Sequence, residues 1–172
     1  MPKILEGVRE NLLREAQKQI LENGYARTTI RSVATACGLG VGTVYNYFPS
    51  KDMLIASFVV EDWYRVMEQM KSTSAECPKI YLSCIYHALL DFAKKHQALF
   101  QDADAAKVFS SAFAQRHVQL RGQLADLMTP LCEGRENASF LAVFMAEAML
   151  TWTMAKVPFD TLYSVLEKIL YK

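Results

Sequence analysis

Helical periodicity extends along almost the whole chain, and it is the feature that most limits the folds open to it. Between residues 4 and 22, apolar side chains recur every three or four positions, and charged side chains occupy the opposite face. This pattern is typical of an amphipathic helix. Alternating, strand-like segments are nearly absent. The sequence therefore predicts an all-α fold.

Glycine, proline and polar segments divide this pattern into separate helices. Gly24 is expected to end the first helix in a left-handed conformation, and residues 72–78 form a polar break. Ser50 is expected to cap the helix that follows it, with Asp52 in the first turn. The predicted helices cover residues 4–22, 30–37, 41–48, 51–71, 79–95, 97–113, 115–129, 136–156 and 159–171.

Two of these helices are short and are joined by a sharp turn over residues 38–40. Thr29 is expected to cap the first of them, and Gly38 supplies the positive φ that the turn needs. Ala34 is small enough for the second helix to cross it closely. Two short helices joined in this way form a helix-turn-helix, whose second helix fits the major groove of DNA.

The second short helix is expected to bury Val44 and Phe48, together with Leu39 of the turn. This packing leaves a set of hydroxyl, amide and apolar side chains on or near the outer face. Such groups can bind phosphate oxygens or base edges, which favours a DNA-binding surface over a helical hairpin whose tyrosines are simply exposed to solvent. The outward residues of this helix are Val41, Gly42, Thr43, Tyr45, Asn46 and Tyr47.

The charge distribution supports the same interpretation. Residues 1–51 carry a net charge of +3, whereas the remaining residues carry −2. A basic N-terminal part attracts phosphates, although the asymmetry is small.

The segment resembles the DNA-binding head of the tetracycline-repressor (TetR) family. The resemblance covers roughly residues 5–60 and rests on a gap-free set of positions: Thr29, Ala34, Gly38, Gly42-Thr43, Tyr45, Tyr47-Phe48 and Ser50-Lys51. It implies an N-terminal three-helix head over residues 1–50 and a helical ligand-binding and dimerisation domain over residues 51–172.

The resemblance also implies roles for individual residues. Thr29 lies near phosphate, Arg31 contacts DNA and Gly42 allows close backbone approach. Thr43 faces bases or phosphate, while Tyr45, Tyr47 and Lys51 bind phosphates. Two positions depart from the family pattern: Gly40 replaces the usual serine cap, and Val41 replaces a residue that is often polar or basic.

The remaining sequence shows no catalytic constellation, cofactor motif or metal-ligand spacing, so we expect no enzyme, cofactor or metal. The four cysteines are expected to be reduced and buried. Aromatic and methionine residues indicate either an ordinary core or a cavity for a small apolar or aromatic effector. The candidate effector contacts are Tyr86, His87, Asp91, Gln97, Phe109, Phe113 and Trp152.

The last two helices are expected to form a homodimer face. Residues 138–152 contain one charged residue, Glu147, so this helix needs cover on two sides. Residues 136–156 and 159–171 of two chains could form a four-helix bundle, although a buried monomer core would give the same pattern. A dimer would place two reading helices on a palindromic double-stranded operator.

The sequence thus predicts a dimeric transcriptional regulator, a repressor released from its operator by the effector through movement of the helix at 51–71. One alternative keeps the DNA-binding head without an effector. Another is a helical ligand-binding protein or enzyme. The charged N-terminus and the lack of an 18-residue apolar run argue against a signal peptide and a membrane span, so a cytoplasmic location is expected.

Overall fold

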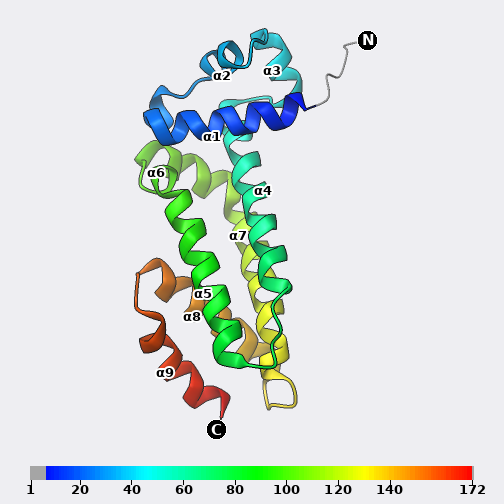
Figure 1. Cartoon of the computed structure of the whole chain (residues 1–172), viewed down its shortest axis with the longest axis vertical. Helices are drawn as coiled ribbons and strands as arrows, with labels where there is room; N and C mark the ends of the chain where they lie inside the picture. The colour runs from blue at the N-terminus through cyan, green and yellow to red at the C-terminus, as the bar shows by residue number, and fades with distance from the viewer. Residues whose placement is uncertain (1–6, 172) are drawn as a thin grey trace. The chain divides into compact units, whose positions relative to one another are not determined.

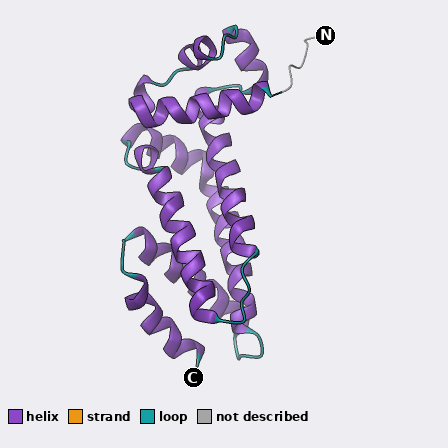
Figure 2. Cartoon of the chain, in the orientation of Figure 1, coloured by secondary structure: helices purple, strands orange, loops and turns teal. Residues whose placement is uncertain are grey.

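A computed structural model describes residues 7–171 of the protein, with the side chains of residues 108–117 outside the description. The described part is helical and contains no strand, which confirms the predicted all-α class (Figure 2). The helices are α1 (Val8–Arg27), α2 (Ile30–Ala36), α3 (Val41–Tyr47), α4 (Lys51–Lys71), α5 (Pro78–Lys95), α6 (Gln97–Phe100), α7 (Ala103–Cys132), α8 (Ala138–Met154) and α9 (Phe159–Leu170) (Figure 1).

The chain divides into two compact units. The first unit contains the residues up to Asp62 together with His96–Ala112, and the second contains Trp63–Lys95 together with the chain from Phe113 onward. These packing units differ from the functional division at residue 50, which stays a prediction. No helix within residues 7–171 combines the length and the hydrophobicity that crossing a membrane requires.

Helix α1 contributes a row of buried apolar side chains to the first unit. Leu12, Ala16 and Ile20 are buried, as the four-residue spacing predicts, whereas Leu21 is 58% exposed. Gly24 has the expected positive φ of +77° and a ψ of 173°, so it interrupts the regular helix as predicted, and a short helical stretch follows it and ends at Arg27. Ile4 and Leu5, which the sequence also placed on this helix, lie outside the described residues.

Helix α4 contributes to both units. The Ser50 hydroxyl accepts a hydrogen bond from the Met53 backbone N–H at 3.1 Å, which confirms the predicted cap. Leu54 and Ile55 are buried in the first unit. Trp63 is buried in the second unit, where its indole donates to Gln123 Oε1 at 2.9 Å.

Two predicted boundaries between α5 and α8 are wrong. The helix predicted over 97–113 breaks after Phe100, because the Asp102 carboxylate accepts hydrogen bonds from the Asp104 and Ala105 N–H groups and so starts α7. The break predicted at Gln115-Arg116 does not occur, and α7 runs through it. Glutamine and arginine are good helix formers, so polarity alone does not end a helix.

In the second unit, α5 packs against α8 and α9, and α8 packs against α9. One face of α8 is buried there, as shown by Ala142, Met145, Ala146 and Met149. The cysteine prediction holds only in part: all four are free, Cys132 is buried, Cys37 and Cys84 are half-buried, and Cys77 is exposed. Cys77 precedes α5, in a segment without an apolar face to bury it.

A polar cluster joins the end of α1 to the start of α4. The Tyr25 hydroxyl donates to the Asp52 carboxylate, while Lys51 Nζ donates to the Tyr25 carbonyl and lies 3.6 Å from the Tyr25 ring centroid. Burial raises the pKa of Tyr25 well above its ordinary value, and the bond to Asp52 adds to this. Burial lowers the pKa of Lys51. The cluster therefore fixes the position of the start of α4 relative to the end of α1.

Replacing Tyr25 by Phe is expected to lower the free energy of unfolding by about 1 kcal/mol near pH 8, because the bond to Asp52 is lost. The raised pKa means that this stabilisation is complete below about pH 10 and is lost as the pH rises above it. Urea unfolding at pH 8 and pH 11 measures both effects. The control is Tyr64→Phe, at a tyrosine that is 49% exposed. A Tyr25→Phe deficit that stayed the same at both pH values would contradict the assignment.

Candidate nucleic-acid interface

Thr29 caps α2, as predicted, and its partner is Ser32. The Thr29 hydroxyl accepts from the Ser32 N–H, and the Ser32 hydroxyl accepts from the Thr29 N–H, both at 3.0 Å. The Ser32 hydroxyl also lies 2.6 Å from Gln19 Oε1. The reciprocal bonds between Thr29 and Ser32 therefore define the start of α2, and the bond from Ser32 to Gln19 attaches this start to α1. The sequence reasoning missed Ser32, because glutamate or glutamine is the usual residue at this position.

The turn between α2 and α3 has the predicted geometry. Gly38 adopts a φ of +67°, and the Leu39 N–H donates to the Ala34 carbonyl at 2.8 Å. Gly40 begins α3 without a side-chain cap. Val44 is fully buried and Phe48 is 3% exposed, so α3 packs through the residues that the spacing indicated.

This packing creates a depression at the surface with a volume of about 440 Å³. Its walls come from the start of α2, from α3 and from the start of α4. The lining residues are Thr29, Ile30, Arg31, Val41, Tyr45, Pro49, Ser50 and Lys51. Five of the nine predicted DNA contacts therefore lie together, although they come from three helices.

The other four predicted contacts lie elsewhere on α3. Gly42 and Asn46 are exposed, whereas Thr43 and Tyr47 are half-buried. A Cβ added to Gly42 would meet no atom within 4 Å, so glycine is not required there by packing within the chain. The open space above this residue leaves the backbone accessible to a bound partner.

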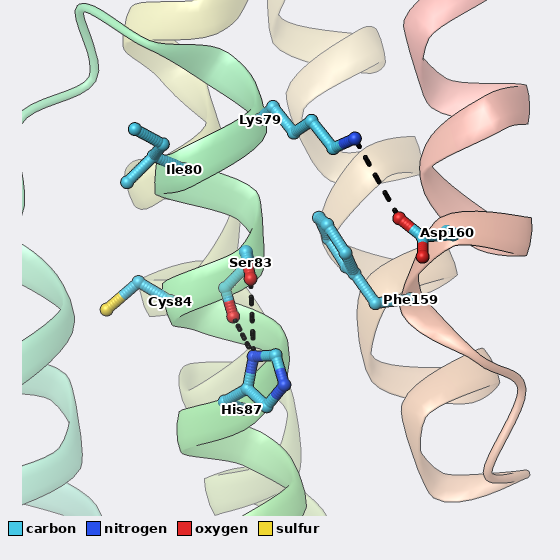
Figure 3. A pocket seen from close by; sticks show the side chains of 7 residues that line it. All are labelled: Lys79, Ile80, Ser83, Cys84, His87, Phe159 and Asp160. Carbon is cyan, nitrogen blue, oxygen red and sulfur yellow. Dashed lines mark hydrogen bonds and ion pairs between the residues drawn. The ribbon is translucent and has the colours of Figure 1, made fainter.

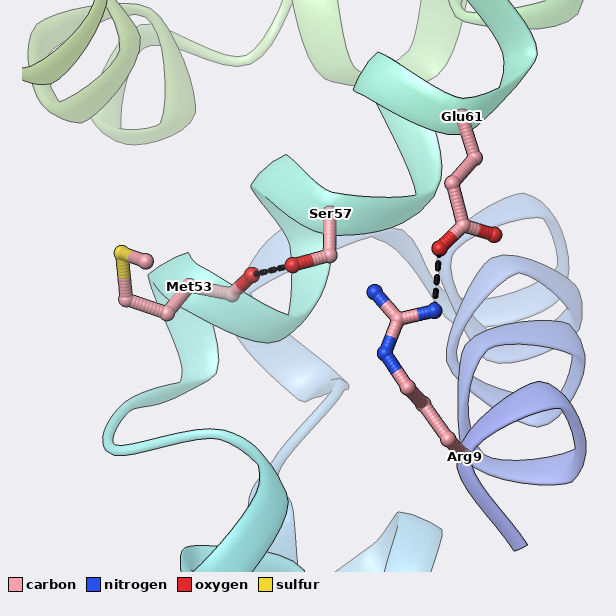
Figure 4. A network of polar contacts seen from close by, with 4 residues as sticks. All are labelled: Arg9, Met53, Ser57 and Glu61. Atoms are coloured by element: carbon pink, nitrogen blue, oxygen red, sulfur yellow. Dashed lines mark hydrogen bonds and ion pairs between the residues drawn. The ribbon is translucent and has the colours of Figure 1, made fainter.

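A second polar contact holds α1 against α4, away from the depression. The Arg9 guanidinium forms an ion pair with Glu61 (Figure 4), and its Cζ lies 5.6 Å from the centroid of the Phe48 ring. Both charged side chains are partly exposed, so the ion pair contributes little by itself. Its position matters more, because Phe48 directly follows α3 and Arg9 covers it.

In the second unit, an open groove of about 510 Å³ lies along α5 and the start of α9 (Figure 3). Lys79 Nζ and Asp160 Oδ1 face each other at 3.8 Å. The His87 imidazole Nδ1 lies 2.8 Å from the Ser83 carbonyl. The lining combines charged, hydroxyl, thiol and apolar groups: Lys79, Ile80, Ser83, Cys84, His87, Phe159 and Asp160.

Of the predicted effector contacts, His87 lines this groove. Tyr86 is buried beside it and uses its hydroxyl to donate to the Val157 carbonyl at 2.8 Å. Asp91 and Gln97 are exposed, and Trp152 is 49% exposed. The side chains of Phe109 and Phe113 lie outside the described residues. The described structure therefore does not gather the predicted contacts around one cavity.

Thr153 is a polar residue that the sequence reasoning did not single out. It is fully buried on α8, and its hydroxyl has no hydrogen-bond partner among the described residues. A buried hydroxyl without a partner is costly, so this position favours a bound polar group. The sequence around Thr153 does not predict this unpaired hydroxyl, because a threonine in an apolar helix can usually donate to a carbonyl of its own helix.

Solved structures share this fold. A TetR-like regulator from Rhodococcus sp. RHA1 is 19% identical, with a TM-score of 0.61 over 98% of this chain and 97% of its own. The Thermus thermophilus FadR repressor, solved in complex with lauroyl-CoA, is 18% identical, with a TM-score of 0.61 over 94% and 92%.

Sequence relatives are regulators too. The KstR repressor of Rhodococcus jostii is 27% identical over 67% of this chain, and the match spans 58% of that protein's length. The BetI regulator of Burkholderia thailandensis is 27% identical over 94% of this chain and 90% of its own.

Residues 12–58 match the profile of the bacterial regulatory proteins of the tetR family. This segment contains most of α1, all of α2 and α3, and the start of α4, so it includes every residue that lines the depression. The match shows that residues 12–58 form a segment of the type found in the tetR family of bacterial regulatory proteins, and the helical fold of the chain is similar to that of regulators of this type.

Proposed function

We propose that the protein is a dimeric, sequence-specific transcriptional repressor that a small apolar or aromatic effector releases from its operator. The observation that carries the DNA-binding part is the depression, which gathers Thr29, Arg31, Val41, Tyr45 and Lys51 around one end of α3. A protein of this kind acts in the cytoplasm, where its operator is.

In this proposal α3 enters the major groove and the depression faces the phosphate backbone beside it. Thr43 and Asn46 supply a hydroxyl and an amide to base edges, while Arg31, Tyr45 and Tyr47 contact phosphates. Gly42 allows the start of α3 to approach the DNA closely. Val41 offers an apolar contact, such as one with a thymine methyl group.

Lys51 has two roles in the proposal. Its ammonium donates one hydrogen bond to the Tyr25 carbonyl, and an ammonium carries three donors. The remaining donors lie at the edge of the depression, where they can bind a phosphate. Lys51 would thereby connect DNA binding to the joint between α1 and α4.

The dimer is proposed from the uncovered face of α8 and α9. On α8, 73% of Phe140, opposite the buried residues, and 49% of Trp152, at the edge of the buried face, are exposed. The other large apolar residues that α8 and α9 expose are Val143, Phe144, Met154 and Val165. Such an extended apolar surface marks an interaction site, and a second copy offers the matching surface.

The effector is proposed from relatives of the same fold and from two features of the second unit. One structural neighbour was solved with lauroyl-CoA, and another is described as a flavonoid-responsive regulator, at 16% identity and a TM-score of 0.58. Within this chain, the groove beside His87 and the unpartnered hydroxyl of Thr153 are the candidate contact points. The alternative is a DNA-binding regulator that has no effector.

Replacing Tyr45 by Phe is expected to weaken operator binding about tenfold, since a hydrogen bond to a charged phosphate is lost. The operator is obtained by selecting duplexes from a random pool with the wild-type protein, and affinity is measured by fluorescence anisotropy at fixed salt. Tyr64→Phe is the control. Failure to select any duplex would contradict the DNA-binding proposal. Unchanged binding of the Tyr45→Phe variant would remove Tyr45 from the interface.

Replacing Phe140 and Phe144 together by Glu is expected to halve the mass found by analytical ultracentrifugation, from twice 19.5 kDa to the monomer value. Two carboxylates cannot be buried in an apolar interface without partners. Leu21→Glu, at an exposed residue of α1, is the control. A wild-type monomer, or a double variant that stays dimeric, would exclude this face.

Lauroyl-CoA and a panel of flavonoids are the first effector probes. A true effector is expected to raise the melting temperature and to weaken operator binding at least fivefold, because it binds the DNA-released state more tightly. The His87→Leu variant is expected to show a smaller rise in melting temperature if the groove is the binding site. A shift in melting temperature with unchanged operator affinity, or no shift with any probe, would favour the regulator without an effector.

A further inference from the structure

A buried acid–imidazole pair lies within the first unit, away from the depression. His96 Nε2 is 3.1 Å from Asp62 Oδ2, and the two side chains are 1% and 6% exposed. A charged or polar group buried this deeply persists only where its partners compensate for the lost water. The fold therefore has to provide partners for this pair. Neither side chain takes part in the proposed contacts with DNA or effector.

The pair marks the place where α5 ends and α6 begins. The His96 carbonyl accepts hydrogen bonds from the Leu99 and Phe100 N–H groups, which starts α6. Its ring stacks on Phe58 of α4, with centroids 6.0 Å apart and an interplanar angle of 18°. The corner between α5 and α6 is thus held to α4 by a ring stack and by the contact with Asp62.

The same carboxylate oxygen also binds the head. The Gln17 side-chain amide donates to Asp62 Oδ2 at 3.0 Å. Gln17 belongs to α1, which packs against both α2 and α6. One oxygen atom therefore holds together the helix under the helix-turn-helix, the helix α4 and the start of α6.

The neighbouring residue of α4 is anchored in the second unit. Trp63 follows Asp62 and donates to Gln123 of α7, and its ring meets Phe92 of α5 edge-on at 5.4 Å. Two consecutive residues of one helix are thus fixed by different units.

We propose that Asp62 and His96 are positioning residues for operator binding, which act through Gln17 to set how α1 and the reading helix are held on α4. This proposal rests on the DNA-binding function proposed above. A charge-assisted hydrogen bond in a dry site is strong and directional, so it resists small displacements of α1.

The test is a double-mutant cycle on Gln17→Met and Asp62→Asn, both of which keep the side-chain length. Each single variant is expected to weaken binding to the selected operator duplex about fivefold or more. The double variant is expected to bind no more weakly than Asp62→Asn alone, because the change at Asp62 already disrupts the contact with Gln17. The control is Gln69→Met, an exposed glutamine of α4.

Amide hydrogen exchange of the full chain without DNA gives a second readout. Exchange in α2 and α3 is expected to accelerate in Gln17→Met and in Asp62→Asn, while exchange in α8 and α9 stays unchanged. His96→Gln keeps an N–H donor for Asp62 and is expected to restore most of the affinity that His96→Leu loses.

Two results would overturn the proposal. They are wild-type affinity in Gln17→Met, and effects of Gln17→Met and Asp62→Asn that simply add in free energy. If the wild type selects no duplex, the DNA-binding function fails, and the exchange rates of α2 and α3 still decide whether this pair positions the head. If His96→Leu does not fold, the cycle on Gln17 and Asp62 decides.

Discussion

The structure of the head depends on the apolar face of α1. Helices α2 and α3 have seven residues each, which is too short for either to be stable alone in water. They are stabilised by tertiary packing, because Val33, Ala34 and Val44 are buried and α2 packs against both α1 and α3. Every group that faces DNA in the proposed function is therefore placed by side chains that face away from it.

Helix α1 is in turn held to α4 by polar links at three points along its length. Arg9 meets Glu61, Gln17 meets Asp62, and Tyr25 meets Asp52. They differ in burial: the first is largely exposed, whereas the carboxylate of the second is buried. Because electrostatic contacts strengthen away from water, the buried link is the one best able to set the position of the head.

In the second unit, the features that point to function are an exposed apolar face and a buried hydroxyl on α8. Its helix α8 is apolar on nearly every side, and among the described residues one of these sides is buried. Within the described residues, the exposed apolar face of α8 and the hydroxyl of Thr153 have no partner. This is why partner and effector are proposed from this unit, while DNA binding is proposed from the first.

The sequence by itself determined the all-α class and the helix-turn-helix. Local signals set these features: the periodic apolar positions of α1, the cap at Thr29, the positive φ of Gly38 and the cap at Ser50. Such signals act between residues close in the chain, so they can be read without knowing the fold. The outward position of residues such as Val41 and Tyr45 on α3 also follows from local periodicity. Both line the depression in the structure.

Only the tertiary structure decided the contacts between distant segments. Nothing near Lys51 in the sequence indicates that its ammonium binds the Tyr25 carbonyl, and nothing near His96 indicates Asp62. The break before Asp102 was also missed, because one carboxylate's backbone bonds decided it against a continuous helical pattern. Long-range polar pairs have no periodicity to reveal them. Their energy comes from burial, and burial is a property of the assembled fold.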